Sequence, residues 1–121
     1  MNNNNRKYPR ITIREKIEIM HDGDNFKPVG DESREAICTV MDMAFGGACV
    51  RTNIREKIGF SLDIKFPSVE NMETFVEHGK VIRVEESKDS TPLNPQYLLG
   101  IKFTKPNVNR IQKFMKICTS F

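Results

Sequence analysis

Apolar and polar residues alternate along most of this chain, and this pattern restricts the fold more than any other feature of the sequence. In residues 59–66, GFSLDIKF, every second residue from Phe60 onward is a large apolar one until Pro67 ends the pattern. A period of two is typical of a β-strand with one buried face and one exposed face. Alternation of this kind predicts six strands, in residues 11–20, 35–43, 46–52, 59–66, 75–86 and 96–104.

Two of these segments depart from strict alternation. In residues 11–20, four isoleucines share one face and Glu15 interrupts them. In residues 75–86, the apolar residues change from one face to the other, which predicts a bulge or a strong bend around Gly79. Between the first two strands, residues 21–33, HDGDNFKPVGDES, are rich in turn-forming residues and are predicted to be a loop.

Only the C-terminal end changes period. Pro106 and Asn107 can open a helix, and apolar residues then recur at helical spacing. A chain of 121 residues suits one domain with one modest core. The sequence therefore predicts a mainly β fold, a six-stranded antiparallel β-barrel with a C-terminal α-helix, in which residues 1–5 are a disordered polar lead and residues 6–121 form the domain.

The net charge of +3 is unevenly distributed. Residues 1–10 contain three basic residues and no acid, and residues 100–121 contain five basic residues and no acid, so the residues between them carry a net charge of −5. Basic ends around an acidic middle argue against a surface coated for a nucleic-acid polymer. They permit a local anion site near one or both termini.

Other compositional features exclude further classes. The chain has no run of eighteen apolar residues and no shorter apolar segment near Met1, so neither a membrane span nor a secretory signal is expected. Cys38, Cys49 and Cys118 are scattered without a C-x-x-C pair, and only His21 and His78 could join them around a metal, so a structural metal site is not expected. We expect buried, reduced cysteines and a cytoplasmic location.

Two short segments are candidates for a functional site. RKYPR, residues 6–10, places Arg6 and Arg10 at the ends of a run stiffened by Pro9. MDMAFGGACV, residues 41–50, joins two predicted strands through paired glycines, which allow a ligand to approach the backbone closely. Each segment also has a simpler interpretation, a basic tail that aids solubility in the first case and a tight hairpin connection in the second.

Together, these segments resemble the motifs of the PilZ domain family. RKYPR is similar to the family's R-x-x-x-R motif, and DMAFGG is similar to most of its D/N-x-S-x-x-G motif. The later segments GKVIRVEE and LLGIKF resemble family strands that tend to read G-x-V-x-R-V and G-I-x-F. The resemblance covers residues 6 to about 118 in the family's order. It implies a PilZ-like barrel that binds the bacterial second messenger cyclic di-GMP.

The resemblance implies a ligand site made of seven residues: Arg6, Lys7, Arg10, Asp42, Ala44, Gly46 and Gly47. Guanidinium groups match phosphate oxygens and the O6/N7 edge of guanine, and a carboxylate can accept from guanine N1–H and N2–H₂. Ala44 replaces the family's serine, and a lost hydroxyl contact costs on the order of 1 kcal/mol. Affinity is therefore expected to fall by up to roughly tenfold, which leaves weakened but real binding. Arg51 and Arg83 could add a stacking or phosphate contact, although surface ion pairing is the commoner role.

The resemblance thus implies a receptor. The residues themselves do not indicate an enzyme, because no phosphate loop or acid/base carboxylate pair is present and Cys49 lacks a partnering histidine. The expected ligand is cyclic di-GMP, without a further cofactor or metal. We expect a stand-alone domain, a monomer or a homodimer, that passes the signal to an unidentified effector protein. Two alternatives stay open: a degenerate PilZ-like domain that binds only proteins, and a small barrel that binds RNA or DNA through its basic ends.

Overall fold

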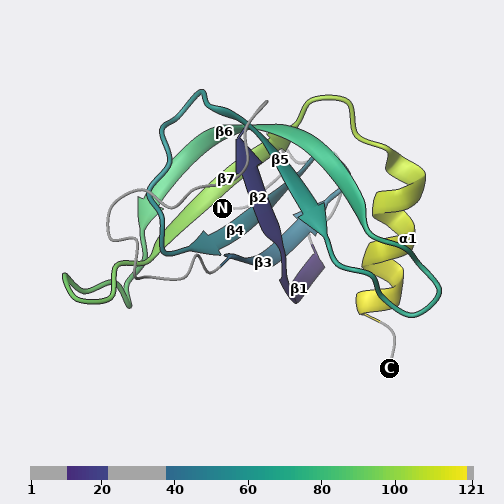
Figure 1. Cartoon of the computed structure of the whole chain (residues 1–121), viewed down its shortest axis with the longest axis horizontal. Coiled ribbons are helices and arrows are strands. Elements are labelled where there is room, and N and C mark those ends of the chain that lie inside the picture. The colour runs from purple at the N-terminus through teal and green to yellow at the C-terminus, as the bar shows by residue number, and fades with distance from the viewer. Residues whose placement is uncertain (1–10, 22–37, 120–121) are drawn as a thin grey trace, which may run out of the picture.

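The computed structural model describes residues 11–21 and 38–119, which form seven antiparallel strands and one helix (Figure 1). The predicted mainly β fold with a C-terminal helix is confirmed. The predicted disordered lead, residues 1–5, and most of the predicted loop at residues 21–33 lie outside the described residues. The elements are β1 (Ile11–Lys16), β2 (Glu18–His21), β3 (Cys38–Ala44), β4 (Gly47–Thr52), β5 (Ser61–Phe66), β6 (Phe75–Glu86), β7 (Tyr97–Phe103) and α1 (Val108–Cys118).

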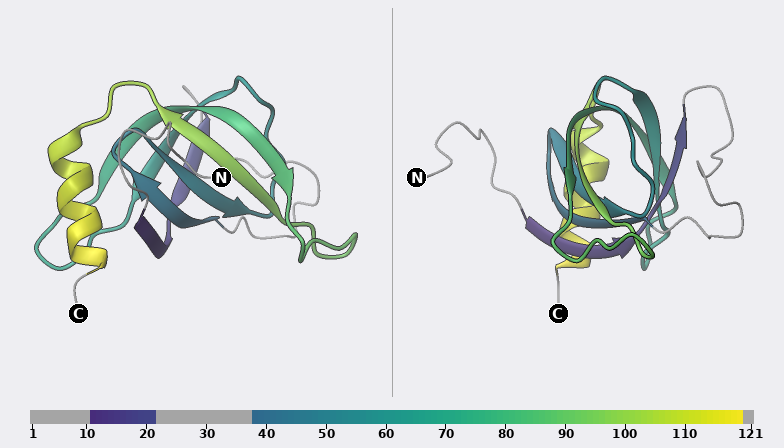
Figure 2. Two further views of the ribbon diagram at one scale, coloured as in Figure 1. Left: turned by 180° about the vertical axis from the view of Figure 1, so that it is seen from behind. Right: turned by 90° about the vertical axis from the view of Figure 1, so that its left-hand side faces the viewer.

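The seven strands form one sheet in the order β1-β3-β4-β7-β6-β5-β2. The sheet curls on itself, and the view along its axis in Figure 2 shows the strands as a ring with α1 behind it. The two strands at the ends of this order, β1 and β2, are consecutive in the chain. A single stretch of backbone therefore links the first and last strands of the sheet and gives the molecule its barrel shape.

The prediction of six strands was wrong in one respect, because the first predicted strand is divided into β1 and β2. β1 pairs with β3, where Ile11 lies opposite Met43, and β2 pairs with β5, where Ile19 lies opposite Ile64. Between them, the N–H of Ile17 donates to the backbone oxygen of Cys38 over 3.0 Å, and its side chain is buried. The alternation of apolar residues continues through the change of partner, so the sequence pattern does not reveal the break.

The bulge predicted around Gly79 occurs three residues later. The register between β6 and β7 shifts between Val81 and Arg83, whereas Gly79 keeps its place in a regular alternation of buried and exposed residues. Close packing explains the glycine: a Cβ atom at this position would lie 2.6 Å from Ile101 Cγ2 and 3.0 Å from the backbone oxygen of Lys102.

Four phenylalanines form the centre of the core where α1 meets the barrel. The ring of Phe66 stacks on that of Phe75 with their centroids 4.8 Å apart. The ring of Phe114, from α1, meets the Phe66 ring edge-on with a centroid distance of 5.1 Å. Phe103 completes the group at 6.5 Å from Phe66. Aromatic rings in these offset and edge-to-face arrangements contribute beyond the area that they bury. The apolar face of α1 is thus fixed against one end of the barrel.

A buried carboxylate also holds the start of α1. Glu77 lies on the inward face of β6, and its oxygens accept from the backbone N–H of Asn107 at 3.3 and 3.4 Å. Asn107 is the N-cap of α1, and its side-chain oxygen accepts from the N–H of Arg110. Burial raises the pKa of Glu77, and the bond from Asn107 and the charges of Arg110 and His78 offset part of this rise.

Candidate functional site

The motif MDMAFGG forms the end of the hairpin between β3 and β4. Met43 and Ala48 lie opposite one another, and both are completely buried, so they face the core. Because side chains alternate across a strand, the neighbouring residues Asp42, Ala44 and Gly47 lie on the outer wall of the barrel. The structure therefore brings three of the predicted site residues together on one accessible surface, with the exposed Gly46 in the adjoining turn.

The two glycines of the hairpin have different surroundings. A Cβ atom at Gly47 would lie 2.4 Å from the backbone oxygen of Ile101, because β7 passes directly beside it. A Cβ atom at Gly46 would have no atom within 4 Å. The backbone oxygen of Gly46 accepts from the N–H of Phe103 over 2.8 Å, which ties the hairpin end to β7. Gly47 thus has a packing requirement of its own, whereas Gly46 leaves open space outside the barrel.

On the outer face of the barrel, the residues beside the motif include the small residues Cys49 and Gly100. Asp42 of β3 lies opposite Cys49 of β4, Cys49 opposite Gly100 of β7, and Gly100 opposite Arg83 of β6. The side chain of Arg83 lies close to Gly100, since a Cβ atom there would be 3.2 Å from Arg83 Cβ and 3.5 Å from its Nε. Arg83 Nε also pairs with Glu85 Oε1 at 3.5 Å. The ion pair considered for Arg83 is therefore present, on the same wall as the motif.

The basic motif cannot be placed in the same way, because Arg6, Lys7 and Arg10 lie outside the described residues. The described chain begins at Ile11, however, and the pairing of β1 with β3 places Ile11 opposite Met43 and Thr12 opposite Asp42. The chain that follows the basic motif thus runs directly beside the hairpin motif.

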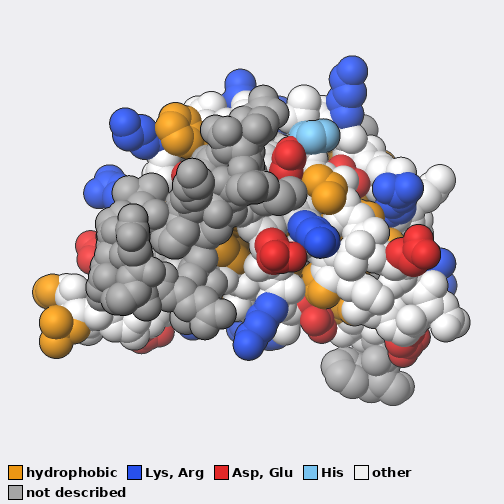
Figure 3. All heavy atoms as spheres, viewed as in Figure 1, with side chains coloured by type: hydrophobic (Ala, Val, Ile, Leu, Met, Phe, Trp, Pro, Cys, Tyr) orange, Lys and Arg blue, Asp and Glu red, His pale blue; other side chains and the backbone are white. Residues whose placement is uncertain are grey.

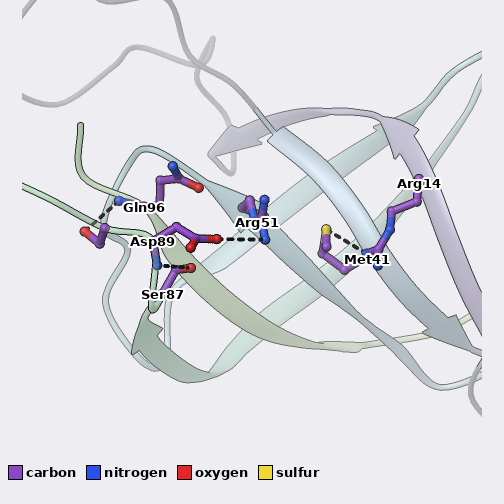
Figure 4. A network of polar contacts seen from close by, with 7 residues as sticks. Arg14, Met41, Arg51, Ser87, Asp89 and Gln96 are labelled. Atoms are coloured by element: carbon purple, nitrogen blue, oxygen red, sulfur yellow. Dashed lines mark hydrogen bonds and ion pairs between the residues drawn. The ribbon is translucent and has the colours of Figure 1, made fainter.

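Arg51 lies on the outer face of β4, two residues after Cys49. Its Nη2 pairs with Asp89 Oδ2 at 3.9 Å, as Figure 4 shows, and its side chain is 40% exposed. Beside it, a cavity of about 250 Å³ is lined by Thr39, Arg51, Thr52, Asn53, Asn94 and Gln96. The sequence does not reveal this cavity, because no motif connects residues 39, 51–53 and 94–96, and only the fold brings them together.

The described residues add little support for other kinds of site. Within residues 11–21 and 38–119, no group of three or more His, Cys, Asp and Glu side chains could hold a metal ion. Over the same residues, no helix is long and apolar enough to cross a membrane. Cys38 and Cys49 are buried, and burial raises the pKa of the Cys38 thiol, which donates to Thr52 Oγ1. On the face drawn in Figure 3, basic and acidic side chains are interspersed.

Comparison with known proteins identifies the family of this fold. The family model of the PilZ domain matches residues 4–119. The chain belongs to the PilZ domain family. This PilZ domain is also similar in fold to a solved structure described as the PilZ domain with c-di-GMP of YcgR from Escherichia coli, with a TM-score of 0.63 and 17% sequence identity over 93% of this chain and 88% of that chain. No significant match was found among curated proteins.

Proposed function

We propose that this PilZ domain is a cytoplasmic receptor that binds cyclic di-GMP and passes the signal to a protein partner. The proposed site combines Arg6, Lys7 and Arg10 with the hairpin residues Asp42, Ala44, Gly46 and Gly47. The family membership and the cyclic di-GMP named with the similar YcgR domain support this ligand.

One observation carries the proposal, the register of β1 against β3. Thr12 lies opposite Asp42 and Ile11 opposite Met43, so the basic motif joins the described chain at the level of the hairpin motif. Arg10 immediately precedes Ile11, and Arg6 precedes it by five residues, a span of about 18 Å at most. Both arginines can therefore reach a ligand that lies on the outer wall beside Asp42.

The proposed contacts follow from the chemistry of the two surfaces. Arginine side chains can each bind a phosphate or the O6/N7 edge of guanine with two hydrogen bonds. The Asp42 carboxylate can accept from the N1–H and N2–H₂ donors of guanine. Ala44, Gly46 and Gly47 have no large side chain, and the space beside Gly46 is open, so a ligand can lie against the backbone there. Ligand contacts made only when the basic segment folds over the hairpin would couple binding to a change of surface that a partner can recognise.

A second candidate function follows from Ala44. The family motif has serine at this position, and Ala44 lies opposite Gly47 at the end of the hairpin with no hydroxyl to donate to the ligand. A domain that has lost enough of its ligand contacts would act only through protein–protein binding. The intact residues Arg6, Arg10, Asp42 and Gly47 favour the receptor.

Isothermal titration with cyclic di-GMP tests the proposal on four proteins: the native chain, Arg10→Ala, Ala44→Ser and Lys113→Ala. A charge-assisted hydrogen bond contributes about 1.5–3 kcal/mol, so Arg10→Ala is expected to weaken binding by roughly 10- to 150-fold. Ala44→Ser is expected to tighten it by up to about tenfold. Lys113 is an exposed residue of α1 at the end of the barrel, and its replacement is the matched control, expected to bind as the native chain does.

The outcomes separate the two candidates. Native binding that Arg10→Ala weakens supports the receptor. No binding by the native chain together with binding by Ala44→Ser would identify the degenerate domain. Absence of binding by all four folded proteins would refute cyclic di-GMP as the ligand. Equal losses in Arg10→Ala and Lys113→Ala would refute the assignment of the site.

A further inference from the structure

The cavity beside Arg51 has the features of a second polar site on the outer wall. It measures about 250 Å³, which is several times the volume of about 30 Å³ that one water molecule occupies in the liquid. It lies between the ends of β3 and β4 and the loop that leads into β7. Its lining residues come from three separate parts of the described chain, so the cavity is a product of the fold.

The arginine in this cavity has an unsatisfied donor. Arg51 Nε is buried and has no hydrogen-bond partner, the one side-chain nitrogen or oxygen of this kind found among the described residues. Its Nη2 makes only a long pair of 3.9 Å with Asp89, whose side chain is 70% exposed. A buried donor left without an acceptor costs free energy, and more so when it belongs to a charged group. Arg51 as a whole lines the cavity and its side chain is 40% exposed, so an acceptor there would meet the accessible part of the same guanidinium group.

The other lining residues suit an acceptor that carries negative charge. Asparagine, glutamine and threonine side chains can all donate hydrogen bonds, and none of the described residues that line the cavity is an aspartate or a glutamate. The hydroxyl of Thr52 accepts from the N–H of Ile54 at 3.2 Å and from the Cys38 thiol, and its own O–H can still donate. Donation to a ligand would therefore come from Arg51 and from the side chains around it.

The loop that supplies Asn94 and Gln96 is held in place by its own hydrogen bonds. The backbone of Gln96 donates to Ser90 Oγ at 2.9 Å and accepts from the N–H of Ser87 at 2.9 Å. Asn94 N–H donates to Thr91 Oγ1 at 3.0 Å. Figure 4 shows this loop beside Arg51, with the side chain of Asp89 reaching from the loop toward Arg51. The position of the cavity wall is thus fixed before any ligand arrives.

We propose that the Arg51 cavity is a binding site for a small oxyanion, a phosphate or carboxylate group. Its charge and donors match such a group, and guanidinium binds planar oxyanions with two parallel bonds. The group can be a free anion, or one phosphate of a larger ligand held on the same wall. Asp89 competes for Arg51 while the site is empty.

Titration of the isotopically labelled protein with inorganic phosphate tests the site directly, at constant ionic strength and pH, with NMR detection. The Nε–H signal of Arg51 and the side-chain amide signals of Asn94 and Gln96 are expected to shift together and to saturate with one dissociation constant. Arg51→Met is expected to weaken the effect on both amides by at least about tenfold. Asp89→Asn is expected to strengthen binding because it removes the competing carboxylate. Arg55→Met, which replaces an exposed arginine four residues away, is the matched control.

Three results would overturn the proposal. The first is a linear, unsaturable drift of these signals with phosphate concentration. The second is an equal response in Arg51→Met and Arg55→Met, with both variants folded as judged by the rest of the spectrum. The third is a response spread evenly over the basic residues of the surface. None of these results depends on cyclic di-GMP, so they leave the proposed function untouched.

A second arm identifies the source of the oxyanion. If saturating cyclic di-GMP shifts the same three signals and abolishes the response to phosphate, the site holds a phosphate of the nucleotide. If the protein saturated with cyclic di-GMP still binds phosphate with the same dissociation constant, the site takes a free anion. Both results support an oxyanion site at Arg51.

Discussion

Replacement of Gly47 by alanine is expected to destabilise the domain, whereas the same replacement at Gly46 is not. The added methyl group at Gly47 would lie 2.4 Å from the backbone oxygen of Ile101, where real Cβ contacts do not come under 3.0 Å. The obstacle is a backbone atom of β7, which cannot turn away as a side chain would. The strands β4 and β7 must therefore separate locally, and β7 lies in the middle of the sheet between β4 and β6.

The size of the effect follows from this contact. Forcing extra atoms into a packed region costs about 1–3 kcal/mol. With a urea dependence of about 2 kcal/mol per molar, the unfolding midpoint of Gly47→Ala is expected about 0.5–1.5 M below that of the native protein. A Cβ atom at Gly46 meets nothing within 4 Å, and Gly46 has no left-handed backbone, so Gly46→Ala is expected within about 1 kcal/mol of the native protein, on either side.

Urea unfolding followed by circular dichroism compares the three proteins. Equal midpoints for Gly47→Ala and the native protein would refute the packing argument and leave ligand binding as the role of Gly47. The reverse pattern, with Gly46→Ala the less stable variant, would refute the placement of β7 against the hairpin.

Three further predictions concern the core and its titrating groups. Because burial raises the pKa of Glu77, the native state holds a proton there more tightly than the unfolded chain, so this group lowers stability as pH rises above about 4.5. Glu77→Gln keeps the acceptor for Asn107, and its free energy of unfolding is expected to rise relative to that of the native protein between pH 4 and 7; a constant difference would contradict the shift. Phe114→Ala is expected to lower the free energy of unfolding in urea by about 3–5 kcal/mol. The exposed Val108 on the same helix is the control, and Val108→Ala is expected to cost less than about 1 kcal/mol. Equal losses would show that Phe114 does not hold α1 against the barrel. Burial, and then the charge of Glu15, raises the pKa of Cys118 to about 11 from the ordinary 9.0. Its alkylation at pH 8, followed by peptide mass spectrometry, is therefore expected to be about a hundredfold slower than that of a free thiol. Labelling at the rate of a free thiol would place this end of α1 in solvent.

Much of this fold could be predicted from local patterns, because a strand with one buried face has apolar and polar residues in alternation along its own sequence. The segment 75–86 is β6 from end to end, and the helix begins directly after Asn107 as the change of period indicates. The hairpin between β3 and β4 was predicted from its paired glycines and the flanking strands. These features depend on interactions between neighbours in the sequence.

The features that could not be predicted depend on distant partners. Ile17 continues the alternation of residues 11–20, yet the chain leaves β3 and joins β5 on either side of it. The bulge lies at Ile82 and not at Gly79. Gly79 is required instead by the close approach of Ile101 and Lys102, which the sequence does not reveal.

The candidate site divides in the same way. Asp42, Ala44, Gly46 and Gly47 were predicted as one group, and the hairpin places them together. The contributions of Arg6, Lys7 and Arg10 stay a prediction, since they lie outside the described residues. The Arg51 cavity could not be predicted, because it depends on the register that sets Thr39 opposite Arg51. It also depends on a loop more than forty residues further along the chain.

The division of the first segment into β1 and β2 has a consequence for aggregation. Residues 11–21 cover the outer sides of both β3 and β5, so their detachment would expose two unpaired strand edges at once. Unpaired edges are templates for pairing with another chain. β1 can cover β3 as soon as β3 has been synthesised, whereas β2 has no partner until β5 follows, because Ile19 pairs with Ile64 far along the chain. Removal of residues 1–21 would therefore leave the outer edges of β3 and β5 open to pairing with another chain.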